Sequence, residues 1–272
     1  MIYGFKPVIQ QRITGIPASV RDMLKFVVLV GAVIWLLGRG TEQMGYHWQW
    51  YRVPPYLLSF EGGTWRMGIL LRGLLVTFKV CGVSLVLAFV LGILAALLRL
   101  SGSVIARFVG RVYVETIRST PLLIQILFTY FVLSPVFGFG RFTAAVLALS
   151  LFEGAYASEV FRAGIVSIDK GQWEAAYSLG LKPLQVYEHI IVPQAVRRML
   201  PPLTSQAVSL VKDSALVSTI AIYDLAMEAQ VIVADTFLTF EVWFTVAAIY
   251  LAITGSLSMI AHRLERRMDA RA

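Results

Sequence analysis

Three ionisable residues stand inside long apolar stretches, where a charge is costly: Glu153, Lys212 and Asp213. A charged side chain at the centre of a bilayer costs about 2.5–3.5 kcal/mol on insertion scales, so such residues usually face a bundle interior or a water-filled path. In such a path Glu153 would meet a cationic group of a solute; the alternative is a protonated or hydrogen-bonded structural acid. Lys212 and Asp213 are adjacent and point about 100° apart on a helix. That arrangement favours a structural network over direct contact with a solute, unless the segment bends and leaves both near the membrane surface.

Two pairs of opposite charge have the spacing of neighbours on one helix face. Glu159 precedes Arg162 by three residues, and Glu115 precedes Arg118 by three. An i,i+3 spacing allows an ion pair on a helix surface. We interpret both as structural pairs, and the first lies where it would brace the polar segment that follows it.

Residue sets for catalysis or metal binding are missing from the sequence. The single cysteine, Cys81, and the widely spaced His47, His189 and His262 make no ligand pattern. There is no Gly-x-x-x-x-Gly-Lys-Ser/Thr loop, no Gly-x-Ser-x-Gly elbow and no His-Glu-x-x-His helix. The sequence therefore predicts no catalytic residue, no metal and no cofactor in this chain.

The composition is that of an integral membrane protein. Of the 272 residues, 58% are hydrophobic and 15% are charged, against about 25% charged in soluble domains. The first apolar run has only 13 residues and needs residues 23–25 to approach the about 20 residues of a span; an interfacial helix is its alternative. Six stretches are expected to cross the membrane: 26–38, 80–98, 121–139, 142–164, 203–223 and 242–261.

Basic residues are distributed unevenly between the two sides of these spans. Segments 1–25, 99–118, 162–212 and 263–272 hold 18 of the 24 Lys and Arg residues, whereas 39–66, 140–141 and 224–241 hold four. The positive-inside rule places the richer side in the cytoplasm. Both termini are therefore expected to be cytoplasmic and the aromatic segment 39–66 outside. The net charge of +8 reflects this topology, not binding to nucleic acid.

The segment 167–202 is a polar, basic island between two spans. A first helix is expected over 172–179, with Gly180 as its C-terminal cap because glycine enters the left-handed conformation freely. A second helix is expected to begin at Pro183 and to end at Pro193. One face of the second helix is expected to carry Leu184, Tyr187 and Ile191. Small residues on the first helix fit close approach to a partner, although an ordinary helical hairpin is the alternative.

This island carries a family resemblance. Glu174-Ala175-Ala176, then Gly180, then Ile190-Ile191-Val192-Pro193 resembles the EAA loop of bacterial ABC importer permeases, with Val192 where the family usually has Leu. The resemblance covers residues 73–267. Flanking motifs are similar to the polar amino acid uptake branch: Arg118-Ser119-Thr120-Pro121, Gly154-Ala155-Tyr156, Arg162-Ala163-Gly164-Ile165 and Lys212-Asp213-Ser214-Ala215-Leu216.

The resemblance implies a fold, which is an all-α integral membrane protein with a five-helix type I ABC importer core. The core would occupy residues 67–267, after a region 1–66 that holds one extra N-terminal helix, and before a cytoplasmic tail, 268–272. The hairpin 172–193 would couple the closure of the ATPase to alternating access. The residues implied to contact the ATPase are Glu174, Ala175, Ala176, Ser178, Leu179 and Gly180.

The resemblance also implies partners in the bacterial inner membrane and on both of its sides. A cytosolic dimer of ABC ATPase subunits would bind ATP and Mg²⁺, and a second permease subunit, identical or paralogous, would complete the path. A periplasmic or lipid-anchored solute-binding protein would deliver a polar amino acid. The alternatives are the same architecture for another small solute, an intramembrane enzyme using Glu153, Glu159 and His189, or a scaffold that only docks a cytosolic partner.

Overall fold

The computed structural model describes residues 18–43, 45–61 and 63–269. The part of the predicted cytoplasmic segment before residue 18, and the predicted tail after residue 269, lie outside the described residues. The chain forms two units, one ending at Trp48 and the other beginning at Gln49. Helix α1 of the first unit, Ala18–Gln43, contains an apolar window of 19 residues, Asp22–Gly40. It is therefore long and apolar enough to cross a membrane, as the shorter run 26–38 predicted.

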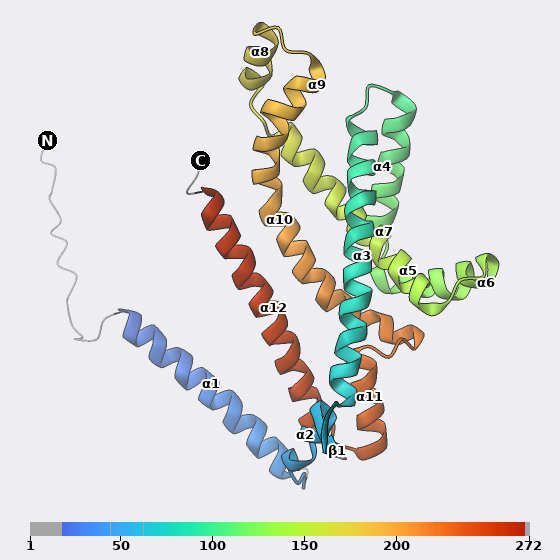
Figure 1. The fold of residues 1–272 in the computed structure, drawn as a ribbon. Helices are drawn as coiled ribbons and strands as arrows, with labels where there is room; N and C mark the ends of the chain where they lie inside the picture. The colour runs from blue at the N-terminus through green and yellow to red at the C-terminus, as the bar shows by residue number, and fades with distance from the viewer. Residues whose placement is uncertain (1–17, 44, 62, 270–272) are drawn as a thin grey trace, which may run out of the picture. The chain divides into compact units, whose positions relative to one another are not determined.

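The second unit is almost entirely helical (Figure 1), which agrees with the all-α fold that the family resemblance implies. It begins with a 3-10 turn, a short helix and a β-hairpin: η1 (Trp50–Arg52), α2 (Pro54–Leu57), β1 (Leu58–Glu61) and β2 (Thr64–Met67). The next elements, in which η2 is a π-helical turn, are α3 (Ile69–Leu100), α4 (Val104–Arg118), α5 (Leu122–Phe128), η2 (Thr129–Leu133), α6 (Ser134–Phe137) and α7 (Arg141–Val166). The last elements, in which η3 is a π-helical and η4 a 3-10 turn, are α8 (Lys170–Ser178), α9 (Pro183–Val186), η3 (Tyr187–Ile191), α10 (Val192–Asp213), η4 (Ser214–Ile220), α11 (Leu225–Thr236) and α12 (Thr239–Asp269).

The aromatic segment expected outside the membrane, 39–66, is shared between the two units. Its part from residue 49 packs on the second unit: Tyr56 and Leu57 contact an apolar cluster of α3, α11 and α12, and the backbone N–H of Gln49 donates to Glu241 at 2.6 Å. The two units thus divide after residue 48, before the domain boundary predicted after residue 66. The reason is that Gln49, Tyr56 and Leu57 already contact the helices of the second unit.

Helices α3 and α7 make the most extensive helix–helix contact of the second unit. Small residues allow it: a Cβ atom added at Gly92 of α3 would lie 2.8 Å from Cβ of Ala157, and one added at Gly154 of α7 would lie 3.0 Å from Cβ of Leu91. Because lipid tails are as apolar as the helix surfaces, close backbone approach and dispersion contacts drive such packing in membranes.

Two of the candidate spans are broken helices. Helix α4 and the run α5–α6 meet at 103°, and the run from α9 to η4 meets α11 at 51°. With each bent pair counted as one span, the described residues hold up to six candidate spans, which agrees with the number predicted. The segment 101–119, expected as a loop or amphipathic helix, is α4, and it packs along α3 as half of a bent span.

The connecting elements gather at the two ends of the second unit. Figure 1 places α8, α9 and the connection between α3 and α4 at one end, and α2, β1 and α11 at the other. The acid-rich segment 224–241 contains α11, where Oδ1 of Asp224 caps the helix by accepting the N–H of Met227 at 2.9 Å. The polar island and the acid-rich segment therefore lie at opposite ends of the bundle.

Replacement of Gly92 by valine should destabilise the chain by about 1–3 kcal/mol, because the added side chain overpacks the α3–α7 contact. Gly82→Val on the same helix is the matched control, since nothing lies within 4 Å of its Cβ position. Thermal unfolding in detergent micelles should show a lower midpoint for Gly92→Val alone. Equal midpoints for the two variants would contradict the close contact.

Candidate functional site

The first helix of the polar island ends at a glycine, as the sequence predicted. Asp169 begins α8 by accepting the N–H of Gly171 at 2.7 Å. After the helix, Gly180 has φ +76°, and the N–H groups of Gly180 and Leu181 donate back into the last turn at 2.9 and 3.3 Å. This pair of bonds is a Schellman motif, whose left-handed residue is usually glycine. The chain therefore reverses sharply at Gly180.

The second helix does not end at Pro193, so that prediction is wrong. Helix α9 begins at Pro183 as expected, but the π-helical turn η3 leads directly into α10, which contains Pro193. The N–H of Val192 donates to the carbonyl of Tyr187, five residues back. A widened turn accommodates the missing N–H and the ring of the proline, which would otherwise clash with the carbonyl four residues earlier.

The π-turn also changes which face of the second helix is buried. Of the three side chains predicted on one face, only Ile191 is buried, whereas Leu184 is 76% exposed and Tyr187 38%. Val186 and Ala195 join Ile191 in the interior. The predicted apolar face is therefore wrong, because the wide turn rotates the residues after it relative to those before it.

The inner face of the hairpin shares one apolar core with the membrane helices. Gly164 of α7 lets Met199 of α10 pack directly against the backbone, since a Cβ atom at Gly164 would lie 2.4 Å from Cγ of Met199. A movement of α8 and α9 must therefore move α7 and α10 or break this core. Its buried members are Ala96, Ala157, Phe161, Ile168, Ala176, Val186, Ile191, Ala195 and Met199.

Polar and aromatic contacts hold the hairpin to the helices on either side of it. Nε2 of Gln194 in α10 donates to Oε1 of Gln172 in α8 at 3.2 Å, and the rings of Trp173 and Tyr187 meet edge to face at 5.1 Å. The guanidinium of Arg198 donates to both the carbonyl and the hydroxyl of Ser167, at the end of α7. The hairpin is thus fixed at its base as well as through its core.

The outer face of the hairpin is open. Of the residues predicted to contact a partner, Ala176 is buried in the shared core, whereas the other five are exposed. Leu179 is 79% exposed and Leu184, across the turn, 76%. Two exposed apolar side chains at the tip, together with the exposed Glu174 of α8, the helix that ends just before Leu179, make a surface suited to docking.

Glu153 is buried in α7, and its side chain lies close enough to Asp213 of α10 to interact electrostatically. Among the residues that the structure describes, no hydrogen bond or ion pair reaches the carboxylate of Glu153. Asp213 is half-buried, whereas Lys212 is exposed. The helix changes to the 3-10 turn η4 directly after Asp213.

Glu159 joins three helices. The guanidinium nitrogens of Arg99 in α3, Arg118 in α4 and Arg162 in α7 lie 2.8, 3.4 and 3.1 Å from its carboxylate. The structure therefore brings Glu159 and Arg162 together. Arg118 reaches Glu159 rather than Glu115 of its own helix, because the α3–α4 turn lays α4 beside α7.

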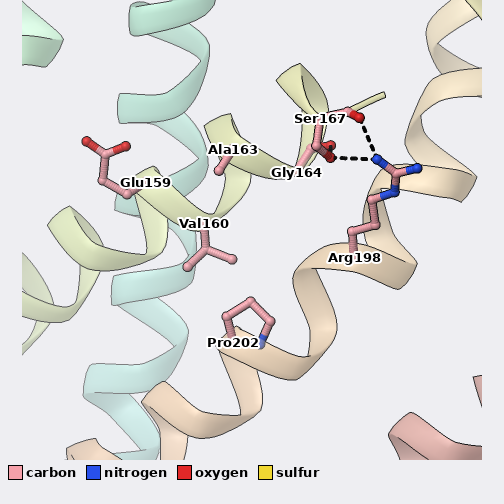
Figure 2. Close-up of a pocket in the computed structure, with 7 residues that line it drawn as sticks. All are labelled: Glu159, Val160, Ala163, Gly164, Ser167, Arg198 and Pro202. Atoms are coloured by element: carbon pink, nitrogen blue, oxygen red, sulfur yellow. Dashed lines mark hydrogen bonds between the residues drawn. The ribbon is translucent and has the colours of Figure 1, made fainter. Parts of the chain in front are cut away.

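A groove of about 430 Å³ opens beside this cluster, between α7 and α10. Figure 2 shows Val160 and Ala163 of α7 facing Pro202 of α10 across it, with Arg198 bonded to Ser167 at its far end. Glu159 lies at the opposite end of the groove from Arg198, and its carboxylate points away from Arg198. The groove is mainly apolar and is bounded by charge at both ends.

The residues considered for an intramembrane enzyme do not assemble. In the described part of the chain, no three His, Cys, Asp or Glu residues lie together as metal ligands would, and Cys81 is buried. His189 lies on the exposed side of η3 with Nδ1 3.1 Å from the carbonyl of Gln185, whereas Glu153 is buried in α7. The structure therefore does not bring His189 and Glu153 together.

Sequence reasoning missed three charged groups. Arg99 makes the shortest contact with Glu159. The only sequence feature that pointed to Arg99 was its position directly after the predicted span 80–98. Asp224 and Glu241 are fully buried, although both were expected in a segment outside the membrane. Asp224 precedes an apolar run, which is the pattern of a helix cap, whereas nothing near Glu241 indicated that it accepts the N–H of Gln49.

Comparisons with known proteins agree on one family. The family model described as "Binding-protein-dependent transport system inner membrane component" matches residues 88–270. The glutamine transport system permease protein GlnP of Escherichia coli (strain K12) is 40% identical over 203 residues, covering 74% of this chain and 93% of that protein. The L-cystine transport system permease protein TcyB of Bacillus subtilis (strain 168) is 41% identical over 206 residues, covering 74% and 87%. A solved structure, "Crystal structure of an amino acid ABC transporter with histidines", matches with a TM-score of 0.69 and 36% identity over 73% of this chain and 94% of that one.

Adjacent alanines in α8 should respond differently to enlargement. Ala176→Leu should loosen the hairpin, because an overpacked core typically costs about 1–3 kcal/mol, whereas Ala175→Leu adds its side chain to an exposed surface. Limited proteolysis of the detergent-solubilised chain should then cut within residues 170–190 faster in Ala176→Leu than in Ala175→Leu or wild type. Equal rates in all three would contradict the shared core.

Proposed function

The chain belongs to the family of binding-protein-dependent transport system inner membrane components, and on that premise we propose that it is the permease subunit of an ATP-driven importer of polar amino acids. The observation that carries the proposal is the hairpin α8–α9. Its outer face exposes Leu179, Leu184 and Glu174, while its inner face belongs to the same core as α3, α7 and α10. A partner that pushes on the outer face would therefore move the membrane helices.

The cycle proposed for this chain follows from that connection. A cytosolic ABC ATPase dimer that binds ATP and Mg²⁺ would seat one hairpin in each subunit, and its closure would displace α8 and α9. A second permease subunit, identical or paralogous, would supply the other half of the path. Solute delivered by a binding protein on the opposite side would cross by alternating access. Both chain ends would lie in the cytoplasm of a bacterial cell, as the distribution of Lys and Arg predicts.

The substrate class is supported by relatives and by the bundle interior. The relatives are named for glutamine and L-cystine, both polar amino acids. Inside the bundle, Glu153 and Asp213 place two carboxyl groups near each other, and an ammonium group is the complement of such a pair. We therefore assign Glu153 to the path of the solute and Asp213, with Lys212, to the network that supports it.

Gly180→Asp should abolish docking of the ATPase and lower uptake at least tenfold, because it places a charged side chain between Leu179 and Leu184. Aspartate tolerates the left-handed conformation better than most residues, so the hairpin should still fold. Gly138→Asp is the matched control: Gly138 has φ +72°, and nothing lies within 4 Å of its Cβ position either.

Affinity purification of the tagged chain from native membranes, with mass spectrometry of the co-purifying chains, makes the measurement. Wild type and Gly138→Asp should bring down an ATPase with a Walker motif, and Gly180→Asp should not. If wild type recruits no ATPase, the importer proposal fails; if Gly180→Asp recruits it normally, the docking role of the turn fails. Any second permease among the captured chains also distinguishes a heterodimer from a homodimer.

Glu153→Gln should lower uptake at least tenfold or change the range of amino acids carried, because it removes a charge from the proposed path. ATPase recruitment and thermal stability should stay near wild type, since no ion pair of Glu153 is lost. The measurement is uptake of radiolabelled amino acids into proteoliposomes, with the exposed Glu115→Gln as control. Unchanged uptake and an unchanged substrate range would show that Glu153 is a structural acid.

A further inference from the structure

We propose that Arg118 and Arg162, backed by Arg99, form a binding site for the phosphate of an anionic membrane phospholipid beside Glu159. The site lies on the surface of the bundle, at the end that carries the hairpin. It is independent of the transport function, since it requires only that this chain stands in a bilayer with these three arginines together.

The charge balance of the cluster calls for a second anion. Three guanidinium groups share one carboxylate, so one negative charge faces three positive ones. Nη1 of Arg99 is buried and has no hydrogen-bond partner. A partly buried cluster with excess charge of one sign is unfavourable, and an added anion would relieve it.

Two of the three arginines can be reached from outside. The side chains of Arg118 and Arg162 are 42% and 37% exposed, against 15% for Arg99. The guanidinium of Arg118 lies 4.9 Å from the centre of the Tyr156 ring, and such stacking limits the orientations that the group can adopt. Planar guanidinium forks match the oxygens of a phosphate group, so two of them held on the two oxygens of one carboxylate are suited to binding a phosphate.

The groove beside the cluster distinguishes a lipid from a soluble anion. Its walls are the apolar side chains of Val160, Ala163 and Pro202 with the backbone at Gly164, and Glu159 lies at one end of it (Figure 2). The three arginines do not line the groove, so a ligand that uses both features has to extend past Glu159. A ligand that uses both features has a charged head and an apolar chain. A phospholipid would place its phosphate on the arginines and part of an acyl chain in the groove.

The surface of α4 favours the same ligand. Arg107, Arg111 and Arg118 follow one another at intervals of four and seven residues, which places them on one face of the helix. Away from this face, Phe108 is 67% exposed and Ile105, on nearly the opposite side of the helix, 76%, as expected of a helix in contact with lipid. Basic pockets on the cytoplasmic side of membrane proteins recognise anionic headgroups, and the distribution of Lys and Arg predicts that side for this end.

Titration with lipid tests the site directly. The purified full chain in a neutral detergent is titrated with phosphatidylglycerol and, separately, with phosphatidylcholine, and bound lipid is counted by native mass spectrometry. Wild type should bind phosphatidylglycerol at least tenfold more tightly than phosphatidylcholine. Arg118→Gln combined with Arg162→Gln should remove that preference, whereas Arg263→Gln, an exposed arginine on α12, should keep it.

Glu159→Gln separates a lipid site from a clamp between helices. It removes every ion pair of the cluster but keeps the three arginines, so the lipid-free chain should melt at a lower temperature while its affinity for phosphatidylglycerol stays at or above wild type. If this variant loses the lipid preference, the arginines act only as a clamp and the proposal is overturned.

Three further results would overturn it. These are equal binding of the two lipids by wild type, an undiminished preference in the double variant, and inhibition of lipid binding by millimolar inorganic phosphate, which would indicate a site for a soluble anion. If the double variant cannot be purified, Arg118→Gln and Arg162→Gln are measured singly, and each should weaken phosphatidylglycerol binding severalfold.

Discussion

The close approach of α3 and α7 is the contact on which the rest of the second unit depends. In a bilayer the hydrophobic effect does not press helices together, so the association rests on backbone proximity and on polar contacts. Glycine and alanine supply the first along the middle of the pair. The ion pairs between Glu159 and the arginines supply the second at the hairpin end, where they add α4 to the pair. Together, these contacts pack α3, α4 and α7 against one another at the end of α7 from which the hairpin begins.

The hairpin has two faces with opposite requirements, and its local structure serves both. The Schellman turn at Gly180 brings α8 and α9 together so that Ala176 and Val186 enter the shared core. The same reversal leaves Leu179 and Leu184 uncovered. The π-turn before Pro193 then keeps the chain helical into α10, so the hairpin continues into a membrane helix instead of ending in a flexible joint. A displacement of the exposed tip is therefore transmitted in two ways. The continuous helix from α9 to α10 transmits it along the chain, and the packed core transmits it through side-chain contacts.

Apolar run length and local turn chemistry made most of the architecture predictable. The spans around α3, α7 and α12, the cap at Gly180 and the helix start at Pro183 follow from hydropathy, from the conformational freedom of glycine and from the fixed φ of proline. The continuation through Pro193 was not predictable, because a proline ends a helix or follows a π-turn according to the packing around it. The partner of Arg118 was missed for a related reason: an i,i+3 neighbour is visible in sequence, whereas Glu159 is 41 residues away.

The buried acids of the second unit differ in how the chain compensates them. Glu241 accepts a backbone N–H from Gln49, Asp224 caps α11 through Oδ1 while its buried Oδ2 has no hydrogen-bond partner, and the partly buried Glu159 has three arginines. Glu153 has no such partner within the described residues; the charged group that acts on it is a second carboxylate, Asp213. Burying an uncompensated acid beside another acid weakens a fold. Among these four acids, Glu153 is the one that the described residues leave without a hydrogen bond or ion pair, and this is the reason for proposing that it lies on the path of a cationic group.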